Sequence, residues 1–138
     1  MVIQRWQNLL LLIAVVLMCV FCSTPYAIDR AAETPAEVYV SDAPVFLVIN
    51  LVIAALLVIA IFLFRDLRRQ MTVTLITIVL VCASIVTCGF IMYAYMPDAE
   101  LIWTGGVLLL IASLVCAGAA YRFMSKDRAL LRSYDRLR

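Results

Sequence analysis

Two cysteines in this sequence have the spacing of a redox site. Cys19 and Cys22 form a Cys-x-x-Cys pair, the arrangement found in dithiol oxidoreductases. A redox thiol must ionise and must meet water, but both cysteines lie in a continuous apolar stretch with no basic residue beside them. Free cysteine is a common small apolar packing residue. We therefore expect these two to pack, and a membrane thiol redox protein is the least favoured function.

No other residues point to catalysis. The sequence contains no histidine, which excludes imidazole as a base or a metal ligand. It also lacks the cluster of four ligands that a zinc site requires. We therefore expect no catalytic, cofactor-binding or metal-binding residues and no cofactor, and we predict that the protein is not an enzyme.

Asn50 is a strongly polar side chain deep within a long apolar segment. Polar groups inside a membrane can mark a transport path, although ionisable groups are the stronger indication. Hydrogen bonding between helices is the commoner use of such an asparagine. We predict an interhelical polar contact at Asn50 and keep a small homo-oligomeric transporter or channel-like protein as the alternative function.

The segment 122–138 is the most distinctive polar part of the chain. Read as a helix, it places Arg128, Arg132 and Arg136 at successive i, i+4 positions, where like charges cost about 0.2–0.5 kcal/mol per pair. An anionic surface would offset this repulsion. One interpretation is an interfacial helix on anionic lipid headgroups, and the other is a docking site for a cytoplasmic or membrane protein of unknown identity. Nucleic acid is disfavoured, because no recognition module accompanies the charge. The candidate contact residues are Lys126, Arg128, Arg132, Asp135, Arg136 and Arg138.

The elements that must position these residues follow from the distribution of charge. Of the 138 residues, 67% are hydrophobic and 14% are charged, against roughly 45–50% and about 25% in soluble domains. Four uncharged runs of 23, 22, 28 and 21 residues separate the charges, and a helix needs about 20 residues to cross a bilayer. The sequence therefore predicts an all-α membrane protein: four transmembrane helices in an antiparallel bundle, plus a short basic amphipathic C-terminal cytoplasmic helix.

The transmembrane domain is expected to cover residues 1–121 and the basic cytoplasmic tail residues 122–138. The predicted spans are about 6–26, 45–64, 72–95 and 101–121, with an outer loop at 27–43. We expect Tyr26 to lie at the outer membrane interface. We expect Ser41 or Asp42 to cap the second span and Asp98 to cap the fourth.

Orientation follows from the basic residues. One side of the predicted membrane carries 10 of the 11 Lys and Arg residues and a net charge of +7, and the other carries a net charge of −5. Basic residues favour the cytoplasmic side, so both termini are expected in the cytoplasm.

Both ends of the chain resemble a known family. The start, Met1-Val2-Ile3-Gln4-Arg5-Trp6-Gln7, resembles a Met-Ile-Gln-Arg-Ile-Gln start, and the end resembles a Lys-Asp-Glu-Lys-Leu-Val-Arg-Ser-x-Asp-Arg-Leu-Arg ending. The matching tail residues are Lys126, Asp127, Arg132, Ser133, Asp135, Arg136, Leu137 and Arg138, whereas Arg128 and Ala129 stand where the pattern has Glu-Lys. In these features the chain is similar to the domain-of-unknown-function 4293 family, four-span inner-membrane proteins of Bacteroidetes. The resemblance implies a multi-pass protein of the bacterial inner membrane and brings no known activity.

These features lead to one expectation about function. The chain should be an integral inner-membrane protein of unknown biochemical activity, acting as a non-enzymatic accessory or scaffold subunit through its basic cytoplasmic tail. Its expected surroundings are a bilayer with anionic headgroups and a protein partner, and a homo-oligomer stays open.

Overall fold

Four long helices make up most of the protein. The computed structural model describes residues 2–31, 33–102 and 106–135, with side chains for all of these except residues 2–5 and 135. Each helix contains a stretch long and apolar enough to cross a membrane, which confirms the predicted fold class. The helices are α1 (Val2–Ser23), α2 (Pro44–Phe62), α3 (Leu67–Tyr95) and α4 (Leu108–Asp135).

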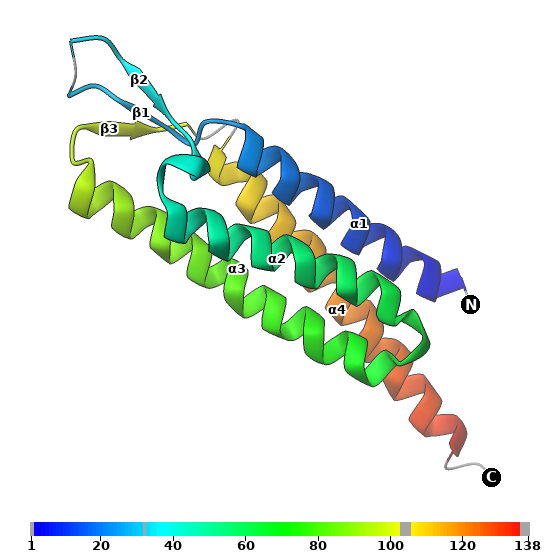
Figure 1. Cartoon of the computed structure of the whole chain (residues 1–138). Coiled ribbons are helices and arrows are strands. Elements are labelled where there is room, and N and C mark those ends of the chain that lie inside the picture. The colour runs from blue at the N-terminus through cyan, green and yellow to red at the C-terminus, as the bar shows by residue number, and fades with distance from the viewer. Residues whose placement is uncertain (1, 32, 103–105, 136–138) are drawn as a thin grey trace.

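The helices run up and down in an antiparallel bundle. Helix α1 packs against α2 and α4, and α3 packs against α2 and α4, so each helix contacts its neighbours in sequence and α4 returns to α1. The beginning of α1 and the end of α4 lie at the same end of the bundle (Figure 1). We call this the terminal end. The opposite end carries a small β-sheet, and we call it the sheet end.

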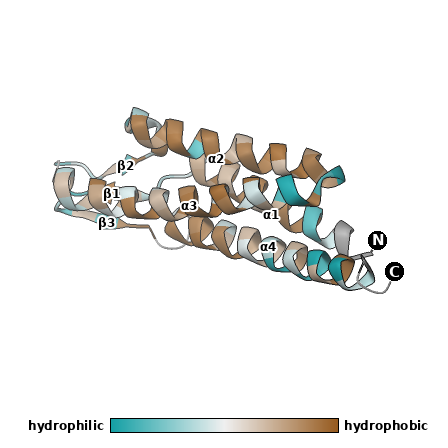
Figure 2. Ribbon diagram, turned by 90° about the horizontal axis from the view of Figure 1, so that it is seen from below, coloured by the Kyte–Doolittle hydropathy of each residue, from teal (hydrophilic) through white to brown (hydrophobic). Residues whose placement is uncertain are grey.

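The distribution of polar side chains is that of a protein folded in lipid. Large apolar side chains such as Val45, Val79 and Val86 are exposed on the outside of the bundle, and apolar residues cover most of the helices (Figure 2). The interior instead contains fully buried polar side chains. In a bilayer, polar groups are more favourable inside the protein, where they find hydrogen-bonding partners. The fully buried polar residues are Gln7, Asn50, Gln70, Thr74, Thr77, Ser84 and Ser113.

A three-stranded antiparallel sheet includes part of the predicted outer loop. Its strands are β1 (Ala27–Asp29), β2 (Ala36–Val38) and β3 (Ala99–Leu101), with β1 in the centre. Ala27 pairs with Val38 on one side and with Leu101 on the other. The predicted outer loop 27–43 thus contains β1 and β2. The prediction that the fourth span begins at about 101 was wrong, because that residue belongs to β3.

The caps of two helices differ from those expected. Helix α2 begins with Pro44 at its first turn and Ala43 at the cap position, whereas the Asp42 carboxylate accepts a hydrogen bond from the Tyr39 backbone N–H (2.7 Å). Asp98 precedes β3 and so does not cap α4. A carboxylate just before an apolar segment can cap a helix or stabilise a turn. Here Asp42 lies in the turn after β2 and Asp98 lies in the turn before β3.

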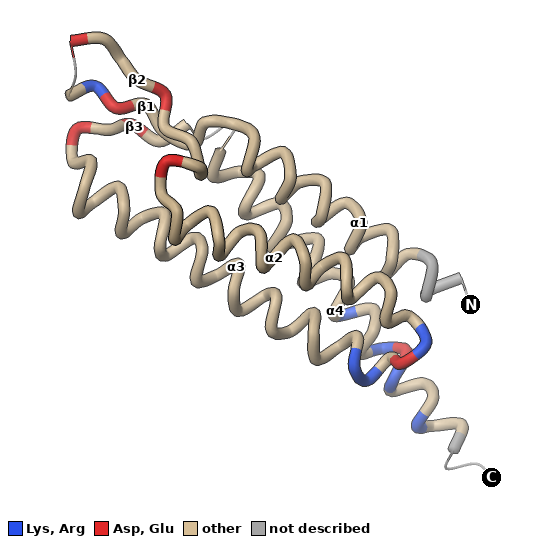
Figure 3. Tube along the Cα trace, in the orientation of Figure 1, with Lys and Arg blue, Asp and Glu red and all other residues tan. Residues whose placement is uncertain are grey.

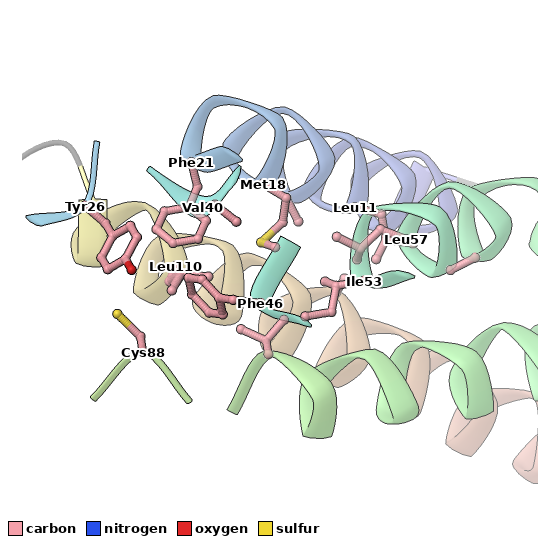
Figure 4. Close-up of a cluster of buried hydrophobic side chains, with 14 of the residues drawn as sticks. Leu11, Met18, Phe21, Tyr26, Val40, Phe46, Ile53, Leu57, Cys88 and Leu110 are labelled. Atoms are coloured by element: carbon pink, nitrogen blue, oxygen red, sulfur yellow. The ribbon is translucent and has the colours of Figure 1, made fainter. Parts of the chain in front are cut away.

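Tyr26 lies in the protein core at the sheet end, three residues after the apolar stretch of α1. Its side chain is fully buried, and its ring lies 6.4 Å from that of Phe21 and 5.6 Å from that of Phe46, centroid to centroid (Figure 4). Backbone hydrogen bonds next to the sheet hold Tyr26 in this position. Its N–H donates to the Val38 carbonyl (3.0 Å), and its carbonyl accepts from the Ile102 N–H (2.9 Å).

The basic tail is a continuation of α4 and not a separate short helix. Helix α4 runs without a break from Leu108 to Asp135, and its last turns extend beyond the other helices (Figure 1). No proline or glycine follows Gly118 within the described part of α4, so the sequence contains nothing there to end the helix.

Candidate functional site

Four arginines line one open cleft at the terminal end of the bundle. The cleft has a volume of about 440 Å³ and lies between the α2–α3 turn and the last turns of α4. Basic residues gather around this turn and along the end of α4 (Figure 3). The lining residues are Arg65, Asp66, Leu67, Arg68, Arg128, Leu131 and Arg132.

The two walls of the cleft come from distant parts of the sequence. A 3₁₀ turn at Leu63–Arg65 ends the second span, and α3 begins two residues later. Because α3 packs against α4, the start of α3 lies beside the α4 turns that carry Arg128 and Arg132. These two arginines are four residues apart, one helical turn, and so face the same cleft.

The carboxylate of Asp66 lines the cleft, but its described contacts are with Arg69. It accepts a hydrogen bond from the Arg69 backbone N–H (3.2 Å), which caps α3, and it pairs with Arg69 Nε (3.0 Å). Arg69 does not line the cleft. Among the side chains described, no carboxylate forms an ion pair with Arg65, Arg68, Arg128 or Arg132. The cleft therefore brings together four arginines and one carboxylate, Asp66, whose described ion pair is with Arg69.

A polar cluster holds α4 in place just before the cleft. The buried Gln7 side chain donates through Nε2 to the Asp127 carboxylate, which joins α1 to α4. The buried Gln70 side chain donates to Asn8 Oδ1 (3.1 Å), which joins α3 to α1. Since Asp127 directly precedes Arg128, these contacts fix the height and rotation of α4 where the cleft begins.

The structure separates the candidate tail residues into three groups. Arg128 and Arg132 line the cleft. Lys126 is exposed on α4 outside the cleft. Asp135 ends α4 with only its backbone described, and Arg136 and Arg138 lie outside the described residues.

Sequence reasoning missed the other half of the cleft, Arg65 and Arg68. In the sequence, these two arginines contributed only to the charge difference from which the orientation of the chain was predicted. The missing step is geometric: an up-and-down bundle places the second turn and the C-terminal segment at the same end, and a closed ring of four helices puts α3 beside α4. Charge and topology together would have indicated the site.

Asn50 forms a polar contact inside the bundle. Ser84 Oγ on α3 donates to Asn50 Oδ1 (2.9 Å), and Asn50 Nδ2 donates to the Phe46 carbonyl (2.8 Å). Both side chains are fully buried. The oxygen and the nitrogen of the Asn50 side-chain amide thus each have a partner within the protein. The bond to Ser84 joins α2 to α3.

The cysteines are spread over the bundle. Cys19 is exposed and Cys22 half-buried on α1, Cys82 is exposed and Cys88 buried on α3, and Cys116 on α4 is half-buried; all five are free thiols. Within the described ranges, no three Cys, Asp or Glu side chains gather as they would around a metal ion.

The family model described as Domain of unknown function (DUF4293) matches residues 3–137. The chain belongs to this family. No curated protein and no solved structure matches the chain. The matched range includes both walls of the cleft, so in this DUF4293 protein the arginine cleft is part of the family domain itself. The four apolar helices make the chain a multi-pass membrane protein.

Proposed function

We propose that this DUF4293 protein is a non-enzymatic accessory or scaffold subunit of a bacterial inner membrane, acting through the C-terminal part of α4. The observation that carries the proposal is the extension of α4 past the other helices as one continuous helix (Figure 1). A rigid helix that begins in the bundle holds its end at a fixed place relative to the membrane, as a docking element requires.

The proposed orientation places the terminal end in the cytoplasm. Basic residues of the α2–α3 turn and of α4 gather at this end, while the sheet end carries acidic residues (Figure 3). This asymmetry supports cytoplasmic termini through the preference of Lys and Arg for the cytoplasmic side.

The surface offered for docking is the part of α4 beyond Ala129. Leu130, Leu131 and Tyr134 are exposed by 51%, 58% and 70%, and Arg132 is exposed between them. Exposed apolar and aromatic side chains flanked by arginine are typical of the energetically dominant residues of protein interfaces. We expect the partner to be a protein with an acidic rim around an apolar patch.

Affinity purification from native membranes tests this proposal. Three forms should be compared: the full chain, a chain ending at Ala129, and the full chain with L130A and Y134A. The truncated chain keeps the contact between Gln7 and Asp127, so the bundle should remain intact. We expect the same protein to be lost from both altered forms.

The matched control replaces two exposed aromatic residues at the opposite end. Tyr93 and Tyr95 are exposed by 86% and 74%, and Y93A with Y95A should retain the partner. An unchanged set of co-purified proteins in the truncated form would overturn the proposal.

A further inference from the structure

The arginine cleft concentrates like charge, with four arginines and one acidic side chain in its lining. Arg128 and Arg132 repel one another across one helical turn, and Arg65 and Arg68 add two more guanidinium groups to the same cleft. The nearby acid, Asp66, is paired with Arg69. Such a cluster is stable when an anion binds between the arginines.

The cleft lies where two candidate membrane spans, Pro44–Arg65 and Leu67–Tyr95, meet. Since charged residues begin at this turn, it should lie near the boundary between hydrocarbon and water, where phospholipid phosphates are found. Leu67 and Leu131 line the cleft beside the arginines. A ligand with both a phosphate and a hydrophobic portion suits this lining better than a wholly soluble one.

We propose that the cleft binds the phosphate headgroup of an anionic glycerophospholipid. Guanidinium groups bind phosphate oxygens with paired, parallel hydrogen bonds, and basic pockets between helices at the cytoplasmic membrane surface are suited to such headgroups. The four arginines favour a lipid with two phosphates, a diphosphatidylglycerol, over a lipid with one. The cleft is open, with a volume of about 440 Å³, so its shape does not restrict entry of a headgroup from the membrane surface.

This inference goes beyond the proposed docking role and does not depend on it. Lipid binding is measured on the purified protein with no partner present. The chain ending at Ala129 lacks the cleft residues Leu131 and Arg132, whereas the docking variants L130A and Y134A change residues that do not line the cleft. The double variant therefore separates the two proposals. One proposal can therefore fail while the other holds.

Native mass spectrometry of the purified full-length protein in detergent tests the assignment. The probes are diphosphatidylglycerol, phosphatidylglycerol and phosphatidylcholine, each titrated separately. We expect saturable binding of one diphosphatidylglycerol, weaker binding of phosphatidylglycerol, and no saturable binding of phosphatidylcholine.

The decisive comparison uses two double variants with the same change in charge. R65Q with R128Q removes one arginine from each wall of the cleft. R122Q with K126Q removes two cations from the same end of α4, outside the cleft. The cleft variant should bind diphosphatidylglycerol about tenfold to thirtyfold more weakly, and the control should bind it as the unaltered protein does.

Three results would overturn the assignment. Equal weakening in both double variants would mean diffuse attraction between charges and no discrete site. Displacement of the lipid by millimolar inorganic phosphate would assign the cleft to a soluble phosphate. If diphosphatidylglycerol bound no better than phosphatidylcholine, the cleft would not be a site for anionic lipid. A third variant, R65K with R128K, guards against misfolding, because it keeps both charges and loses only the paired hydrogen bonds; we expect intermediate affinity.

Discussion

Replacing Gly106 by alanine should destabilise the protein at the point where the sheet meets the bundle. A Cβ atom at Gly106 would lie 2.7 Å from Tyr26 Cα, 3.0 Å from its Cβ and 3.3 Å from its carbonyl oxygen. Non-bonded carbon atoms pack at about 3.5–4.0 Å. The added methyl group therefore overlaps the Tyr26 backbone by roughly 1 Å.

The size of the effect follows from what holds Tyr26 in place. Its backbone is hydrogen-bonded to Val38 on one side and to Ile102 on the other, and its ring packs against Phe21 and Phe46. Each hydrogen bond contributes about 0.5–1.5 kcal/mol, and each aromatic pair contributes a similar amount. Relief by movement of Tyr26 would weaken these contacts together. We expect the upper part of the range for overpacking, about 2–3 kcal/mol.

The matched control is Gly118→Ala within α4, the helix that begins two residues after Gly106. A Cβ at Gly118 would meet no atom within 4 Å, so this change should be neutral or stabilise the helix by up to about 1 kcal/mol. The free energy of unfolding of both variants should be measured in detergent micelles, by denaturant titration with circular dichroism. Equal stabilities for G106A and G118A would refute the reasoning. Because the closest atom is backbone, the penalty should persist when Tyr26 is changed to phenylalanine.

The remaining predictions concern an internal contact, a buried hydroxyl and the orientation of the chain. A double-mutant cycle with N50A and S84A should give a coupling energy of about 0.6 kcal/mol and at most about 1.7 kcal/mol; additive single effects would contradict the hydrogen bond between them. Burial raises the pKa of Tyr26 to about 12 from its usual value of 10.0. The unfolded chain loses this proton first, so the contribution of Tyr26 to the free energy of unfolding is full below about pH 10 and is lost as the pH rises through 12. Tyr26→Phe should abolish that loss and, because the buried Tyr26 hydroxyl has no hydrogen-bonding partner among the described residues, should stabilise the protein by about 1 kcal/mol; a variant with the same alkaline profile as the parent would count against this account. Green fluorescent protein fused to the C-terminus should fluoresce, and alkaline phosphatase fused after Glu33 should be active; the opposite pattern would reverse the proposed orientation.

The number and order of the membrane helices could be predicted because they depend on one simple quantity, the length of apolar chain needed to cross a bilayer. The turn at Asp66 and the apolar segments on either side of it could be predicted from the local sequence alone. The sheet could not be predicted in this way. Its strands are three residues long, too short for a pattern of alternation, and β1 pairs with a strand about seventy residues away. The burial of Tyr26 could not be predicted for the same reason, since the pairing of β1 carries it inward.

The arginine cleft shows which step from sequence to function was missing. Counting charges predicts on which side of a membrane the basic residues lie, and this count treats Arg65 and Arg132 alike wherever they stand along the chain. A binding site instead requires that particular guanidinium groups converge. Convergence here depends on two features that the count does not contain: α4 packs against α3, and the bond between Gln7 and Asp127 fixes α4 one residue before Arg128. Asp127 thus connects the basic tail to α1. Replacing it by a cation would raise the net positive charge and at the same time remove this bond between α1 and α4.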